Sequence, residues 1–215
     1  PASASVISGN GFAISGTLTP ADANTIQTLS ATEASHMVDA NCRMITTVLA
    51  NGENPVNGSI AGKVWVEDNV PLNNGVPYVG RHYEITPALN GSIATARVTL
   101  YFTQAEFDAY NNHPGTNNFE RLPAFPFDAQ GKSNLLIFKY AGTSSDGTGL
   151  PSTYPQDITV IDPDDENITW NEALQRWEVS FDVTGFSGFM VSTSPYFIKA
   201  PPVLYTNWTG NISEE

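Results

Sequence analysis

The sequence is poor in the residues that mark several common protein classes. It holds one cysteine, Cys42, so no disulfide can form within the chain. Lys and Arg number 9 against 22 Asp and Glu, which gives a formal net charge of −13. Nucleic acids and anionic membrane surfaces both attract clustered cations, so we expect neither as a partner.

Long apolar runs are also missing. No stretch approaches the ~20 apolar residues that span a bilayer, so we expect no membrane insertion. The first five residues lack the basic and apolar parts of a signal peptide, so we expect a signal already removed or an excerpt of a longer protein. Cys42 lies beside a strand-like run and is interpreted as a small buried hydrophobe rather than a reactive thiol.

The residues that are abundant suit β-sheets. Hydrophobic residues make up 40% and aromatic residues 11% of the chain, which is enough to fill a core. Only 14% of residues are charged. The balance is rich in Thr, Ser and Asn, a composition that favours strands and polar loops over helices.

The clearest strand lies near the C-terminal end of the sequence. From Trp177 to Val183 apolar and polar side chains alternate, which is the period of a half-buried strand. We expect Trp177 on the buried face and Glu178 on the exposed face. The segment 168–170 is expected to pair with this strand as a hairpin, and 168–193 to form the centre of the core.

Similar patterns predict further strands at 11–18, 42–49, 60–67, 78–86, 94–102, 135–140 and 158–161. Thr103 and Glu106 are spaced as a capping box, which predicts a short helix from Gln104 to about Asn111. Residues 112–133 are expected to form a long irregular loop. Residues 142–155, rich in Gly, Ser and Thr, are expected to form a mobile surface loop.

These elements predict an all-β fold, an antiparallel two-sheet β-sandwich of immunoglobulin-like or jelly-roll-like type with one short helix. We expect a linker or N-terminal strand extension at 1–35 and the sandwich module at 36–195. Residues 196–215, after several prolines, are expected to link to a following module.

Four segments in combination carry a family resemblance: 78–87, with its run Arg81-His82-Tyr83-Glu84, then 98–107, 177–181 and 185–189. Over about 36–193 the chain resembles a β-sandwich module of large modular secreted proteins of the Bacteroidetes, typically cargo of the type IX secretion system. The resemblance implies a non-enzymatic module, an extracellular or cell-surface location, and neighbouring modules of the same polypeptide as partners. It supplies no site residues. The segment 207–211 looks like the start of another such module.

Three residues are candidates for carbohydrate binding. Trp65 is predicted to point outward from its strand, and Tyr101 and Arg97 outward from theirs. Aromatic rings stack on sugar faces, so these side chains could bind a polysaccharide or a surface glycan. The alternative is that a loop such as 112–133 covers the outward faces, because exposed Trp is uncommon on monomers.

An acidic run is the candidate metal site. Its four carboxylates, Asp162, Asp164, Asp165 and Glu166, are the hard oxygen ligands that Ca²⁺ prefers. Pro163 interrupts the run and the spaced calcium-loop pattern is missing, so a solvated acidic loop is the alternative. No other cofactor is expected, since the three histidines lack zinc spacing.

The sequence contains no catalytic motif, neither a Gly-x-Ser-x-Gly elbow nor a phosphate loop. His82 and Glu84 share one strand face and are interpreted as polar cross-strand contacts rather than an acid–base couple. We therefore expect a non-enzymatic extracellular module, a structural spacer or adhesion segment. The alternatives are a carbohydrate-binding module and, third, a glycosidase-like enzyme, because 22 acids always offer carboxylate pairs.

Overall fold

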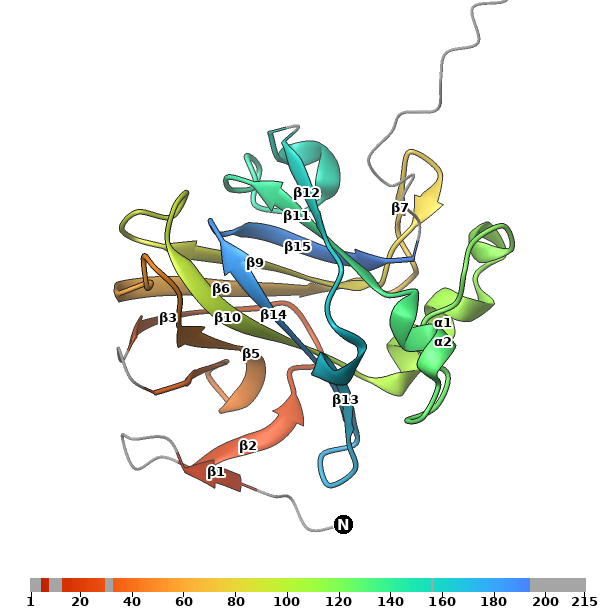
Figure 1. The fold of residues 1–215 in the computed structure, drawn as a ribbon, viewed down its shortest axis with the longest axis horizontal. Helices are drawn as coiled ribbons and strands as arrows, with labels where there is room; N and C mark the ends of the chain where they lie inside the picture. The colour runs from red at the N-terminus through yellow and green to blue at the C-terminus, as the bar shows by residue number, and fades with distance from the viewer. Residues whose placement is uncertain (1–4, 8–12, 30–32, 156, 194–215) are drawn as a thin grey trace, which may run out of the picture.

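The computed structural model describes residues 5–7, 13–29, 33–155 and 157–193. Over these residues the chain forms two large sheets packed on each other, with the α-helices together at one end (Figure 1). The predicted all-β sandwich is confirmed. Its strand pairs are antiparallel except that β2 and β5 run parallel.

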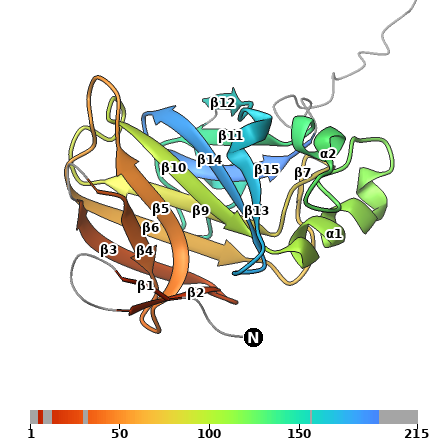
Figure 2. The same cartoon turned by 60° about the horizontal axis from the view of Figure 1, so that its bottom comes forward.

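The first sheet has the strand order β1-β2-β5-β10-β14-β13, with β4 also pairing with β5. Its strands are β1 (Ser5–Ile7), β2 (Ala13–Leu18), β4 (Ser35–Val38), β5 (Arg43–Ala50), β10 (Thr95–Phe102), β13 (Ile168–Asn171) and β14 (Arg176–Thr184). Figure 2 shows β1 and β2 along one margin of this sheet, beyond β5.

The second sheet has the order β12-β11-β15-β9-β6-β3. Its strands are β3 (Ala23–Leu29), β6 (Gly58–Val66), β9 (Arg81–Pro87), β11 (Leu136–Ala141), β12 (Ile158–Ile161) and β15 (Ser187–Ser192). A short ribbon, β7 (Leu72–Asn73) with β8 (Val76–Pro77), connects β6 to β9.

The predicted capping box is present. The Thr103 hydroxyl accepts from the Glu106 amide, and the Glu106 carboxylate accepts from the Thr103 amide, at the start of α1 (Gln104–Asn112). A second helix, α2 (Ala129–Ser133), lies inside the segment expected to be an irregular loop. The described residues also contain three 3₁₀ turns: η1 (Pro114–Thr116), η2 (Pro151–Thr153) and η3 (Asp165–Asn167).

The predicted C-terminal hairpin is present, and the predicted face of its second strand is buried in the core. β13 and β14 pair antiparallel with Trp170 opposite Trp177. Trp177 is fully buried and stacks on Phe107 of α1 with ring centroids 5.8 Å apart. On the opposite face Glu178 is half-buried rather than freely exposed, because it accepts hydrogen bonds from Arg176 and Asn171.

The sandwich begins earlier than the expected boundary at residue 36. β3 pairs with β6 through seven consecutive positions, from Ala23 opposite Val64 to Leu29 opposite Gly58, so part of the segment 1–35 is a strand of the second sheet. The segments 196–215 and 207–211 lie outside the described residues. Cys42 is half-buried, with φ 58° in the turn before β5, rather than buried as expected.

Candidate functional site on the second sheet

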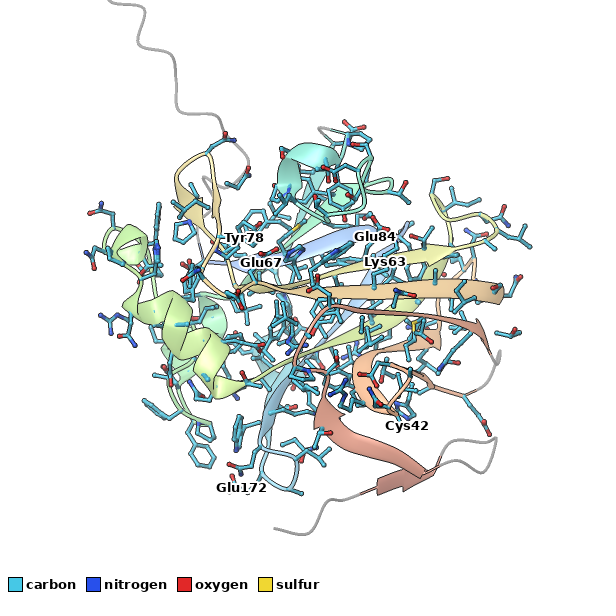
Figure 3. The ribbon with its side chains drawn as sticks, turned by 180° about the vertical axis from the view of Figure 1, so that it is seen from behind. Cys42, Lys63, Glu67, Tyr78, Glu84 and Glu172 are labelled. Carbon is cyan, nitrogen blue, oxygen red and sulfur yellow. The ribbon has the colours of Figure 1, made fainter. Side chains whose placement is uncertain are left out.

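Polar and aromatic side chains gather on the outer face of the second sheet. β6 and β9 are neighbours, and their register places Lys63 opposite Glu84 and Trp65 opposite His82. Because side chains alternate along a strand, these four point away from the core. Together with Glu67 they form what we call the polar layer. Figure 3 shows Lys63 beside Glu84 and Glu67 close by, all on the same face.

The 142–155 loop covers the buried members of this layer, Trp65, His82 and Glu84. Gly149, with φ +69°, lies so close to the Trp65 ring that a Cβ added there would be 2.4 Å from a ring carbon. Trp65 is only 9% exposed as a result. Tyr154, also buried, packs against Tyr140 of β11 with ring centroids 5.7 Å apart. The covering loop is thus 142–155, the segment expected to be mobile, and not 112–133.

Glu84 joins the loop to the sheet. Its side chain is 1% exposed, and its Oε1 is 2.8 Å from the Lys63 ammonium. Its Oε2 accepts from the Ser144 amide at 2.7 Å and from the Tyr154 hydroxyl at 3.1 Å. Burial and the neighbouring Glu84 carboxylate both raise the pKa of Tyr154, so the phenol stays protonated and donates. One carboxylate on β9 therefore binds both β6 and the 142–155 loop.

His82 is fully enclosed beside Glu84. Its ring stacks on Trp65 at 5.2 Å between centroids and meets the edge of Tyr78 at 5.8 Å. Burial lowers the pKa of His82, against the opposing effect of the Glu67 carboxylate 3.2 Å from Nε2. His82 and Glu84 share a face as predicted, but each is bonded to a different partner, so they do not form an acid–base couple.

A hollow of about 390 Å³ adjoins the layer between the 66–70 loop and α1. Glu67 and Glu106 both line it. Two carboxylates beside one hollow could in principle serve hydrolysis. Here, however, Glu106 is bonded to Arg81 Nε at 2.8 Å and to the Thr103 amide, and Glu67 is bonded to His82. Both carboxylates are thus engaged by the chain itself.

Both rings predicted to bind carbohydrate are buried, so neither offers an open stacking face, as in the alternative that their outward faces are covered. Trp65 lies under the loop, as described above. Tyr101 is 4% exposed, with the Arg176 guanidinium 4.0 Å from its ring centroid and its hydroxyl 2.6 Å from Thr47 Oγ1. A sugar could reach either ring only after these neighbours move away.

Arg97 is the accessible member of the predicted set. It lies on the outer face of the first sheet, where its side chain contacts Asp182 at 3.4 Å and Asn167 at 2.6 Å. Trp65 belongs to the second sheet, so the structure does not bring the three candidate residues to one site.

The predicted calcium ligands do not assemble. Asp162, Asp164, Asp165 and Glu166 lie in and just before η3. Across the described part of the chain, no three His, Cys, Asp or Glu side chains converge as a metal-binding group. Asp164 instead accepts a long hydrogen bond, 3.4 Å, from Asn167. The acidic run is an exposed loop, the alternative named for it above.

Ser144 and Tyr154 are the important residues that sequence reasoning missed. Both lie in a polar, glycine-rich segment with no local pattern, and their partner Glu84 is 60 or more positions away. The usable signal was the shared outward face of Lys63 and Glu84, which indicates an ion pair but not its cover. Within the described ranges of the chain, no helix has the length and apolar character needed to cross a membrane. No family model, curated protein or solved structure matches the chain.

Proposed function

We propose that the chain is a non-enzymatic β-sandwich module, a structural spacer or adhesion segment of a modular surface or secreted protein outside the cell. The observation that carries this proposal is that groups of the same chain bind the Glu84 carboxylate. Its carboxylate lies on the outer face of the second sheet and binds Lys63, Ser144 and Tyr154 of the same chain. Such a layer stiffens the module instead of presenting groups to a ligand.

The charge and the core support the same proposal. A net charge of −13 keeps neighbouring copies soluble and apart. The aromatic stack of Trp177 on Phe107 joins the helical end to the first sheet. The resemblance to secreted modules of the Bacteroidetes, typically cargo of type IX secretion, supports the proposed location and the neighbouring modules as partners.

The test compares stability and turnover on one preparation. We expect one cooperative unfolding transition with the same midpoint in reductant, in chelator and in added calcium. Panels of glycosides, esters and peptides should show no turnover, and a glycan array no binding. Turnover that is lost in Glu67→Gln or Glu106→Gln, and kept in the exposed control Glu172→Gln, would replace the proposal with a hydrolase acting at the hollow.

A mechanical measurement tests the spacer role directly. Tandem copies of the chain are stretched by atomic force microscopy. A spacer should unfold in equal, discrete steps, and Glu84→Gln should lower the unfolding force because the loop is no longer tied to the sheet. Smooth extension without steps would contradict a spacer role.

A further inference from the structure

Asn-Gly pairs are frequent in this sequence, at Asn10, Asn51, Asn57, Asn74 and Asn90. The first lies outside the described residues. Among the other four, the structure distinguishes Asn51. The Gly52 backbone N–H donates to the side-chain Oδ1 of Asn51 at 2.7 Å, and the other described pairs lack this contact.

The contact brings two potentially reactive atoms together. A carbonyl bond is about 1.23 Å long, so a nitrogen 2.7 Å from Oδ1 lies about 3–4 Å from Cγ. Reacting atoms in near-attack conformers are about 3–3.5 Å apart. The Gly52 nitrogen is thus close to the carbon it would attack.

Neighbouring residues hold this geometry. Gly52 has φ +81°, and a Cβ there would meet Thr95 Oγ1 at 2.8 Å, so only glycine fits. The Thr95 hydroxyl donates to the Asn51 carbonyl oxygen. On the other side, Asn51 Nδ2 donates to Asp182 Oδ1 at 3.1 Å. Asn51 is exposed, so water reaches it.

The other described pairs are held differently. Asn74 and Asn90 have φ of +50° and +54°, in the left-handed region, whereas Asn51 does not. Gly58, which follows Asn57, is the first residue of β6 and is paired with Leu29 of β3. From the sequence alone, the four described Asn-Gly pairs should be equally reactive. The structure instead singles out Asn51.

We propose that Asn51 is a site of spontaneous covalent modification. The Gly52 nitrogen loses its proton to hydroxide and attacks Cγ of Asn51, forming an N–C bond and a five-membered succinimide. The Cγ–Nδ2 bond breaks, and Nδ2 takes a proton and leaves as ammonia. Water then opens the ring to aspartate or isoaspartate. The net change is amide plus water to carboxylate plus ammonia, with no oxidant or cofactor.

The product changes the loop. A carboxylate replaces the amide that donated to Asp182, so two like charges meet and a hydrogen bond is lost. Two further hydrogen bonds hold the same loop. The Asn54 amide donates to Thr95 Oγ1 at 3.2 Å, and the Val56 amide donates to the Thr95 carbonyl oxygen at 2.9 Å. We expect these contacts to loosen, beside a hollow of about 410 Å³ that Asn51 and Asp182 both line.

The test is a time course on the folded chain in mildly alkaline buffer, read by mass spectrometry. Cleavage after Glu53 separates Asn51 from Asn57. Asn51 should convert about tenfold or more faster than Asn57, Asn74 and Asn90. In urea the four rates should become similar. Earlier conversion of another pair, or a ranking unchanged in urea, would overturn the proposal.

Two variants test the proposal independently of the order of the four conversion rates. Asp182→Ala, at an exposed position, removes the acceptor that holds the Asn51 amide and should slow conversion of Asn51 severalfold. An unchanged rate would contradict the proposal. Asn51→Asp mimics one product and should speed hydrogen exchange of the Asn54 amide. Adding Asp182→Asn should restore the slower exchange, and failure to restore it would contradict the proposed repulsion.

Discussion

The two outward faces of the sandwich carry ion pairs of the same kind in different settings. On the first sheet, Arg97 and Asp182 are 3.4 Å apart, with side chains 31% and 64% exposed. On the second sheet, Lys63 and Glu84 are 2.8 Å apart, and Glu84 is 1% exposed. The 142–155 loop makes the difference, because it covers Glu84 and adds two donors to it.

Covering an ion pair on the surface changes how much its loss costs in free energy of unfolding. Exposed ion pairs contribute about 0–1 kcal/mol, since water screens them. Removing one partner of a buried pair costs about 3–5 kcal/mol, because the other groups are left unpaired. Lys63 remains 39% exposed, so the cost on the second face comes mainly from the donors above Glu84.

Glu84→Ala should lower the free energy of unfolding by about 3–5 kcal/mol. The Ser144 amide and the Tyr154 hydroxyl would lose their acceptor in a site without ready access to water. Urea denaturation measures the change. Asp182→Ala, which removes one partner of the exposed ion pair, is the matched control, and an equal loss in both variants would show that the cover has no energetic effect.

Gly149→Ala should destabilise the chain by about 1–3 kcal/mol, through the left-handed backbone and contact with Trp65. Gly147→Ala isolates the first cause, the backbone, because Gly147 has φ +81° but nothing within 4 Å of its added Cβ. Thermal unfolding should show the larger loss for Gly149→Ala. Equal losses would mean that the loop does not press on Trp65.

Acid should weaken the covered face through His82. Burial lowers the pKa of His82 below its ordinary 6.5, so below pH 6.5 the unfolded chain binds a proton that the folded chain does not. Stability is then present above pH 6.5 and is lost as the pH falls towards the folded pKa, by up to about 1.4 kcal/mol per pH unit.

The measurement is urea midpoints from pH 6.5 to about 5, before most carboxylates titrate. His82→Gln should reduce the slope. The pKa of His36 is also lowered by burial, so part of the slope should remain. If the urea midpoints of wild type and His82→Gln depended on pH in the same way, protonation of His82 would not be the cause of the weakening of the covered face in acid.

Arg97→Ala should have the smallest effect, under about 1 kcal/mol, because its ion pair is exposed. Added salt should remove most of that difference. A loss as large as that of Glu84→Ala, or one insensitive to salt, would mean that the first face is as tightly organised as the second.

Local patterns predicted much of the fold. The alternation after Trp177 and the capping box at Thr103 depend on neighbours in sequence, and both are confirmed. β3 was missed because it is an edge strand of mostly polar residues, with Ile26 74% exposed. The sequence did not reveal that the 142–155 loop covers Trp65. This cover depends on contacts between distant segments, which no local pattern encodes.

Hydrogen exchange of the Ser144 amide reports directly on whether the loop is closed over the sheet, because this N–H donates to the buried Glu84 carboxylate. If the loop is fixed to the second sheet, the amide should exchange nearly as slowly as those of β9, and Glu84→Gln should speed it markedly. Exchange at the rate of an open loop in the wild-type chain would contradict a closed polar layer, and with it the proposal that this face presents no ligand site.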